Sequence, residues 1–256
     1  MKCLFIGDII GRTGRNAIKR FLPEIKEKYE PDFIVANAEN SAGGFGITKK
    51  VYNDLMNSGI DVLTSGNHIF DKKDIFEFIE DVDNLLIPAN YPPGVPGKRY
   101  GIYNVNGKNI GVINLMGRVF MGIPLDCPFR KFDEIYEDIK DKTDYIVVDF
   151  HAEATSEKNA FGYYVDGRAD VIYGTHSHVA TADEKLLPKG SIYLSDIGLT
   201  GAYHSIIGMD IETPIKKFLT GIGSKYEVSK DGLLFQGFFV DLTTKEFFRI
   251  KLYEEK

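Results

Sequence analysis

The chain has 256 residues, 43% of them hydrophobic and 27% charged, which is ordinary for a soluble globular protein that buries a sizeable core. Its formal net charge of −6 gives no general attraction to a polyanion, so we expect no extended nucleic acid as a partner. No apolar run approaches the roughly 20 residues of a membrane span and the N-terminus lacks the pattern of a secretory signal, so the sequence predicts no membrane partner and a cytoplasmic location.

The first half of the chain alternates β-branched runs with segments of helical period. This alternation predicts an α/β fold in which a largely parallel sheet carries helices. Thr48 is the expected N-cap of the second helix, and Pro23 is expected to kink the first. The expected strands are Cys3–Ile6, Phe33–Val35 and Ile60–Leu63, and the expected helices are Asn16–Lys28, Thr48–Asn57 and Lys72–Ile79.

The second half opens with residues 88–96, which are too rich in proline for regular structure. Beyond them, Asn106-Gly107 joins two strand-like runs and predicts a hairpin. Two sheets, or one mixed sheet with antiparallel edges, would hold the elements of a single domain spanning residues 1–256. The expected strands are Tyr100–Val105, Asn109–Leu115, Tyr145–Phe150, Val171–Tyr173, Ile192–Leu194, Gly232–Leu242 and Glu246–Tyr253, and the expected helix is Phe132–Ile139.

Residue types that bind metals collect just after short apolar runs. Because the carboxyl ends of strands in an open α/β sheet meet at one crevice, we expect these side chains to be neighbours. Carboxylate, amide and imidazole donors without a thiolate disfavour a Cys-type structural zinc site and suit Fe, Mn or catalytic Zn. Seven ligands exceed the need of one ion, so two metals are expected. The candidate ligands are Asp8, Glu39, Asn67, His151, His176 and His178, and the amide oxygen of Asn40, beside Glu39, can complete a shell.

The candidate residues differ in the chemistry they offer. Glu39 has two oxygens and can bridge two metals. His176 and His178 are two residues apart, so a strand-like continuation would place both on one face. Histidine ionises near neutral pH, which suits His68 to donate a proton to a leaving alkoxide.

Some of these residues have simpler explanations. Asp8 alone is equally well explained as a turn residue, and the glycine-rich loop of residues 43–46 is slightly better explained as a chain turn than as a phosphate cradle. A single histidine at the end of a strand more often has a structural role than a metal-binding one. Three histidines at the ends of two strands favour a role as metal ligands. His204 follows no apolar run and is left out of the site.

Six segments carry these motifs: Phe5–Asp8, Ala38–Gly44, Gly66–His68, Ala89–Gly94, Asp149–Lys158 and Gly174–His178. Together they resemble the YmdB-type branch of the calcineurin-like metallophosphoesterases, over most of the chain. The wider superfamily usually has Asp-x-His in the first motif and Gly-Asp in the second. Here Ile10 stands at the histidine position and Glu39-Asn40 replaces the aspartate, which separates this branch from the rest.

The resemblance implies a layered α/β/β/α sandwich with mixed sheets, in which residues 88–130 are the candidate for a small cap. It also implies iron or manganese, with zinc as an alternative, a homo-oligomeric assembly, and His68 as the proton donor. It implies that the first metal is held by Asp8, Glu39, Asn40 and His178, and the second by Glu39, Asn67, His151 and His176, with Glu39 as the bridge.

The resulting hypothesis is a dinuclear metal-dependent phosphodiesterase that hydrolyses small phosphodiesters. The resemblance implies cyclic nucleotides, including the 2′,3′ type, as substrates. A phosphomonoesterase is the nearest alternative, because both reactions use the same metal pair. An alternative of another class is a metal-dependent nucleotide-binding regulatory protein with slow turnover, and replacement of His68 by alanine would distinguish it from an enzyme.

Overall fold

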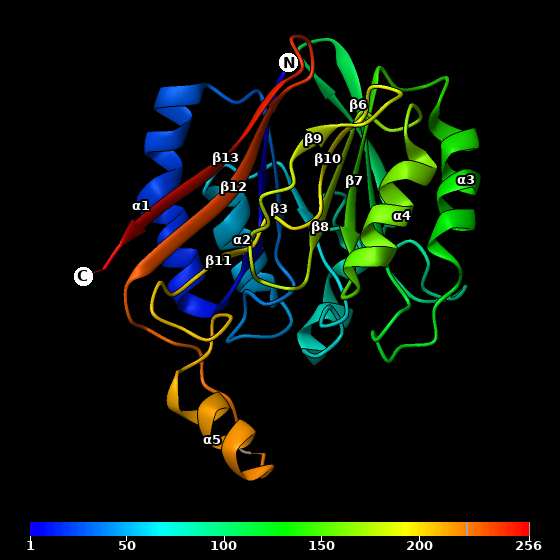
Figure 1. Ribbon diagram of the computed structural model, residues 1–256. Coiled ribbons are helices and arrows are strands. Elements are labelled where there is room, and N and C mark those ends of the chain that lie inside the picture. The colour runs from blue at the N-terminus through cyan, green and yellow to red at the C-terminus, as the bar shows by residue number, and fades with distance from the viewer. Residues whose placement is uncertain (224, 256) are drawn as a thin grey trace.

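Two mixed sheets lie face to face between two layers of helices in the computed structural model, which describes residues 1–223 and 225–255 (Figure 1). The first sheet has the strand order β13-β12-β1-β3-β4. Strands β1, β3 and β4 are parallel, and β12 and β13 extend the sheet in antiparallel fashion. The strands are β1 (Lys2–Ile6), β3 (Phe33–Asn37), β4 (Val62–Thr64), β12 (Leu233–Asp241) and β13 (Glu246–Glu254).

The second sheet has the order β5-β6-β7-β8-β10-β9. Strands β6, β7, β8 and β10 are parallel, and β5 pairs with β6 through the expected Asn106-Gly107 turn. The strands are β5 (Tyr100–Val105), β6 (Lys108–Met116), β7 (Tyr145–His151), β8 (Val171–Thr175), β9 (Lys185–Leu186) and β10 (Ile192–Leu194). Short strands β2 (Asp8–Ile9) and β11 (Leu199–Thr200) form a separate parallel pair.

Helices cover the outer face of each sheet (Figure 1). The first sheet carries α1 (Gly11–Tyr29) and α2 (Lys49–Asn57), and the second carries α3 (Pro128–Ile139) and α4 (Thr155–Val165). Buried side chains fill three layers, one under each helix pair and one between the sheets, where the rings of Phe5 and Tyr173 stack 4.7 Å apart. The fold is therefore the expected α/β/β/α sandwich. Its central strands β1, β3, β7 and β8 are buried on both faces, and their sequences are continuous apolar runs.

Several local expectations need correction. Helix α1 begins at Gly11 rather than Asn16 and continues through Pro23 to Tyr29. The helix expected over Lys72–Ile79 is instead two 3₁₀ segments, η1 (Lys73–Glu77) and η2 (Ile79–Asp81). Their apolar side chains recur every three residues, so a three-residue turn buries Ile75 and Phe78 together.

Two helices have no counterpart among the expected elements. Helix α4 buries Glu157 and Lys158 as well as its apolar residues, so its sequence shows little amphipathic period. Helix α5 (Glu212–Thr220) buries only Pro214 and stands away from both sheets (Figure 1).

The segment of residues 88–130 contributes strands to the second sheet, since it contains β5 and β6. Helix α5 is joined to the body by a narrow stem, in which Asp210 N donates to Glu227 O at 2.8 Å and Ser229 N donates to Gly208 O at 3.0 Å. None of the helices in the described part of the chain is both long and apolar enough to cross a membrane.

Candidate metal centre

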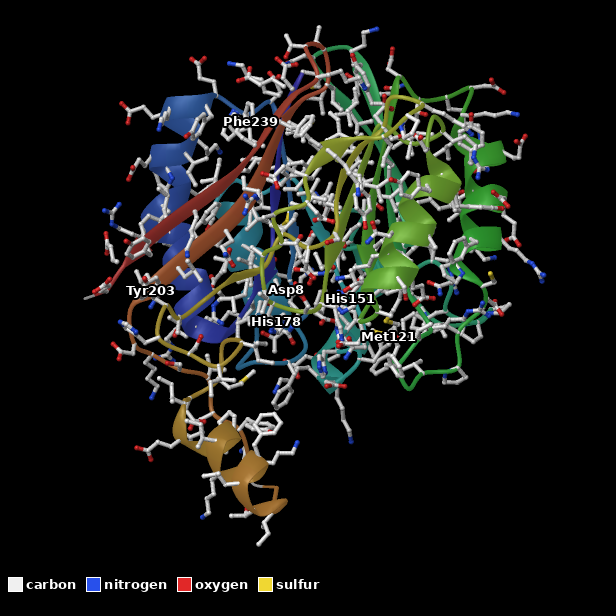
Figure 2. The ribbon with its side chains drawn as sticks, viewed as in Figure 1. Asp8, Met121, His151, His178, Tyr203 and Phe239 are labelled. Atoms are coloured by element: carbon white, nitrogen blue, oxygen red, sulfur yellow. The ribbon has the colours of Figure 1, made fainter. Side chains whose placement is uncertain are left out.

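The seven expected ligands come together where the parallel strands of both sheets end. Asp8 follows β1, Glu39 and Asn40 follow β3, Asn67 follows β4, His151 ends β7, and His176 and His178 follow β8. Figure 2 shows Asp8, His151 and His178 grouped near the lower edge of the two sheets. Because parallel strands point their carboxyl ends the same way, residues up to 170 positions apart become neighbours here.

Glu39 lies at the centre of this group and is fully buried. Its Oε1 is 3.1 Å from His151 Nε2 and accepts a hydrogen bond from Asn40 Nδ2 at 3.2 Å. Its Oε2 accepts the backbone N–H of His68 at 2.9 Å. The ligand atoms of Glu39, His151 and His176 all lie within 4.8 Å of one another, which is close enough for a shared ion.

Hydrogen bonds on the far side of each ring set the tautomers of two histidines. The Thr175 hydroxyl donates to Asp149 Oδ1 at 2.7 Å, so its oxygen accepts from His151 Nδ1 at 2.9 Å and leaves Nε2 facing the centre. His176 Nε2 is 3.0 Å from Glu153 Oε2, which can only accept, so the lone pair of His176 is on Nδ1. Such outer partners are typical of metal-binding histidines.

The inward-facing atoms form a cluster of acceptors. His151 Nε2 lies 3.0 Å from His176 Nδ1 and 3.0 Å from Asn67 Oδ1, in addition to its contact with Glu39. When the His151 ring is charged, its second proton lies on Nε2 and can bond to only one or two of these three acceptors, whereas a metal cation can bind all four groups. The donor set therefore fits a metal ion.

A second group of acceptors lies around Asp8. Its Oδ2 accepts the backbone N–H of His176 at 3.1 Å, but its buried Oδ1 has no hydrogen-bond partner among the described residues. His178 Nδ1 is 2.9 Å from the carbonyl of Ile207, which can only accept, so Nε2 carries the lone pair and lies 3.8 Å from Asp8 Oδ1. An orphaned carboxylate oxygen beside an imidazole nitrogen that carries a lone pair fits a second cation.

Asn40 completes this second group with its amide. Its Nδ2 lies 3.2 Å from His178 Nε2, and it also donates to Glu39 Oε1 at 3.2 Å. The amide nitrogen and oxygen exchange places on rotation by 180°, so the same side chain can present Oδ1 to a cation.

The pKa values of Glu39 and His151 shift in opposite directions, as expected for a close pair of opposite charges. Burial raises the pKa of Glu39, but the charge and hydrogen bond of His151 outweigh burial and lower it to about 2. Burial lowers the pKa of His151, yet Glu39 outweighs it and raises the value to about 9. Burial and neighbouring His151 lower the pKa of His176 to about 3, which keeps its ring neutral. Burial raises the pKa of Asp8.

The loop that carries His176 and His178 has a strained backbone, with φ values of 101° and 64°. Positive φ is costly for residues other than glycine and persists only where the surroundings enforce it. Buried Lys158 from α4 and Asp196 enforce it here. Lys158 Nζ donates to Thr175 O at 2.8 Å and to Asp196 Oδ2 at 2.6 Å, and Asp196 Oδ2 also accepts the N–H of Ser177 at 3.1 Å.

His68 lies at the rim of the cluster, with its side chain 41% exposed. Its Nδ1 is 2.7 Å from Asp71 Oδ2, so Nε2 is the ring atom left to face a ligand. The sequence interpretation took Asp71 as a helix N-cap and gave it no role in the site, and it also missed the supporting roles of Asp149, Thr175 and Glu153. Asp149 and Glu153 belong to a motif segment that the sequence singled out, which is the one signal that pointed to them.

A cavity of about 510 Å³ opens over the metal-binding cluster, which we call the metal cavity. Its floor is polar and includes Glu39, His68, His176 and His178. Its wall comes from α5 and the stem that joins it to the body, and consists of Ile206, Ile207, Met209, Pro214, Phe218 and Tyr226. A polar floor under an apolar wall suits a ligand with a charged end and a flat apolar body.

Comparisons with known proteins agree with this geometry. A relative from Bacillus subtilis, named 2′,3′-cyclic-nucleotide 2′-phosphodiesterase, is 50% identical over 94% of this chain and 91% of its own. A hypothetical protein from Thermus thermophilus has a crystal structure with a TM-score of 0.93, 39% identity, and coverage of 99% of this chain and 100% of its own. The structure of a novel phosphatase from Mycoplasma pneumoniae gives a TM-score of 0.92 at 36% identity, covering 100% of this chain and 94% of its own.

The family comparison covers nearly the whole chain. Residues 4–252 match the family model described as YmdB-like protein. The match includes both sheets, every expected ligand and the stem of α5. On this evidence, together with the relative that is 50% identical, the chain belongs to the YmdB-like family.

Proposed function

We propose that the protein is a dinuclear metal-dependent phosphodiesterase that hydrolyses small phosphodiesters, with cyclic nucleotides, including 2′,3′-cyclic nucleotides, as its substrates. The observation that carries this proposal is the set of acceptor atoms that converge on His151 Nε2 and Asp8 Oδ1 beneath an open cavity. The name of the Bacillus subtilis relative supports the substrate class.

Two metal ions are proposed, one on each half of the cluster. The donors are carboxylate, amide and imidazole, which favour iron or manganese and leave zinc as an alternative. When bound, the ions would activate the attacking oxygen and neutralise phosphate charge. Asp8, Glu39, Asn40 and His178 would hold the first ion, and Glu39, Asn67, His151 and His176 the second.

The protein's own groups supply the remaining steps. His68 would donate a proton from Nε2 to the leaving oxygen, while Asp71 accepts from Nδ1 and stabilises the charged ring. The apolar wall of the metal cavity would bind the base and exclude water from one side of the phosphate. The cytoplasmic location and the homo-oligomeric assembly stay predictions from the sequence.

Substrate choice and metal content test this proposal together. The purified protein would be stripped of metal, reloaded with Mn²⁺ or Fe²⁺, and assayed on 2′,3′-cyclic AMP, a chromogenic phosphodiester and the matching phosphomonoester. We expect two ions per chain by elemental analysis and turnover of both diesters well above that of the monoester. Faster hydrolysis of the monoester would favour a phosphomonoesterase, and nucleotide binding without turnover would favour a regulatory protein.

A further inference from the structure

A second cavity, of about 700 Å³, lies beside the metal cavity, and we call it the basic cavity. Four cationic side chains line it against a single acidic one, Glu227. The cations come from three separate parts of the chain, namely the start of α1, the loop before η1 and the segment before β12. They are Arg12, Lys72, Lys225 and Lys230.

The positive charge of the basic cavity is not neutralised by neighbours. None of its four cations forms an ion pair with any residue in the described ranges 1–223 and 225–255. Lys72 Nζ lies 4.3 Å from the centre of the Phe45 ring. In a chain with a net charge of −6, a concave cluster of free cations creates a local field that attracts anions.

The two cavities lie next to each other, because their lining residues are shared or adjacent in sequence. Tyr226 lines both of them, Gly43 lines the basic cavity, and Gly44 lines the metal cavity. A Cβ on Gly44 would lie 2.8 Å from Cγ2 of Val228, which lines the basic cavity, and 3.6 Å from Cε of Met209, which lines the metal cavity. A ligand bound in the metal cavity therefore has the basic cavity as its immediate neighbour, on the side of Tyr226.

The lining of the basic cavity suits a nucleotide. Its cations can bind a phosphate, and Phe45 and Tyr226, which are 39% and 37% exposed, offer aromatic faces for a base. Asn16 adds a polar group that can bond to a sugar or a base edge. The volume of the cavity is within the range of pockets that bind ligands of this size.

We propose that the basic cavity is a subsite for the nucleotide that precedes the cyclic phosphate, so that the preferred substrates are short oligoribonucleotides ending in a 2′,3′-cyclic phosphate. This inference rests on the proposed function, because the terminal cyclic phosphate must occupy the metal cavity. The 5′-phosphate of the terminal nucleotide and the nucleotide beyond it then meet the free cations. A mononucleotide leaves those cations unused.

Kinetics with two substrates of different length test the subsite. The wild-type enzyme would be compared with the variant R12Q/K225Q/K230Q on 2′,3′-cyclic AMP and on the dinucleotide ApA with a 2′,3′-cyclic phosphate. We expect the wild type to have at least a tenfold higher kcat/KM for the dinucleotide, and the variant to lose this advantage while keeping its activity on the mononucleotide. The advantage should also fall as salt rises.

A charge-matched control separates a local effect from a change in net charge. The variant K19Q/K50Q/K251Q removes three exposed lysines that do not line the basic cavity, and it should keep the dinucleotide preference. Equal kcat/KM of the wild type for the two substrates, or an advantage that persists in R12Q/K225Q/K230Q, would overturn the proposal.

A binding assay distinguishes failure of the subsite from failure of the proposed function. The probe is a fluorescent dinucleotide with a 2′-deoxy 3′-terminal phosphate, which cannot cyclise, and the readout is anisotropy. Binding that weakens in R12Q/K225Q/K230Q supports the subsite even if neither substrate is turned over, in which case only the proposed activity fails. Equal affinity of the two proteins for the probe would refute the subsite independently of turnover.

Discussion

His68 combines an exposed position with a fixed orientation. The carboxylate of Asp71 occupies its Nδ1 at 2.7 Å, and its backbone N–H is bound by Glu39 at 2.9 Å. These two bonds leave Nε2 free at the floor of the metal cavity, where a leaving group would lie.

We expect H68A to lower kcat by about 10²- to 10⁴-fold, because the leaving oxygen would lose its proton donor. Metal content should stay unchanged, since the side chain of His68 is not among the expected ligands. The measurement is steady-state kinetics with elemental analysis of the same sample. H204A is the matched control, because His204 packs on Tyr203 outside the metal cavity, and it should keep wild-type kcat. Unchanged kcat in H68A would refute the assigned role.

Thr175 acts on the site through His151. Its hydroxyl donates to Asp149 and accepts from His151 Nδ1, which fixes the tautomer that presents Nε2 to the cluster. Asp149 is fully buried, and burial raises its pKa to about 7 despite the hydrogen bonds from Thr64 and Thr175.

We expect T175V to lower metal affinity by about 10- to 100-fold, because valine keeps the shape but removes the group that orients the ring. Metal titration followed by calorimetry measures this effect. T175S retains the hydroxyl and should restore most of the affinity. Wild-type affinity in T175V would show that the ring is held by packing alone.

At the scale of single residues, the sequence was most informative about side chains that follow strand ends. It predicted seven ligands, and the structure brings all seven together, although their roles as ligands stay predictions. It did not predict Glu153 as the partner of His176, or Lys158 with Asp196 as the support of the histidine loop. Those pairings depend on how α4 packs against β8, which local sequence does not encode.

The turn after β4 lies directly against the metal-binding cluster. A Cβ on Gly66 would lie 2.2 Å from His151 Nε2 and 2.5 Å from Glu39 Oε2. Real Cβ atoms do not tolerate such contacts, and both neighbours are buried. Only glycine lets this turn lie against the cluster.

We therefore expect G66A to displace His151 and Glu39 and to abolish metal binding and activity. Its free energy of unfolding should also fall by about 1–3 kcal/mol, as for other overpacked sites. Chemical denaturation and metal analysis measure the two effects. G223A is the control, since a Cβ on Gly223 meets no atom within 4 Å, and it should behave as wild type. Full metal content in G66A would contradict the argument.

At the scale of elements, strands were predicted better than helices. The hairpin at Asn106-Gly107 and the apolar strands were visible because turn chemistry and strand burial are local. Helix α4 was missed because it buries charged residues, and η1 was predicted as an α-helix because a spacing of three residues fits both helix types over one turn. Helix α5 was missed because it has no buried apolar face.

The whole molecule depends on two sheets that meet along their inner faces. The alternation of strands and helices predicted parallel strands but left one sheet or two as alternatives. The pairing of β1 with β12 joins segments more than 230 residues apart, and no local pattern predicts such a contact. The layered arrangement came from the resemblance to a known family, and the structure confirms it.

The metal-binding cluster also joins the two sheets, so we expect removal of the ions to lower the stability of the whole molecule. Its expected ligands follow strands of both sheets, so an ion bound by them would link the two sheets in the folded state. At an ion concentration 100 times the dissociation constant, binding to the native state adds about 2.7 kcal/mol. For a chain of this size we expect chelation to lower Tm by roughly 5–10 °C.

Differential scanning calorimetry before and after chelation measures this shift. Addition of Mn²⁺ in excess should restore the original Tm. The same treatment of the variant T175V should produce a smaller shift at equal ion concentration, because its affinity is lower. An unchanged Tm in the wild-type protein would show that the ions contribute nothing to the folded state.

Helix α5 has a consequence for how this enzyme can diverge over evolution. The helix lines the metal cavity through Pro214 and Phe218, yet Pro214 is its one buried residue and Phe218 is 83% exposed. Substitutions at exposed positions usually change stability by less than about 0.5 kcal/mol. If the metal cavity binds a nucleotide as proposed, selection can therefore reshape its base preference through this appendage without disturbing the expected ligands or the sheets. Natural variants that act on different nucleotides are expected to differ here first, and a library restricted to residues 211–222 is the direct route to altered selectivity.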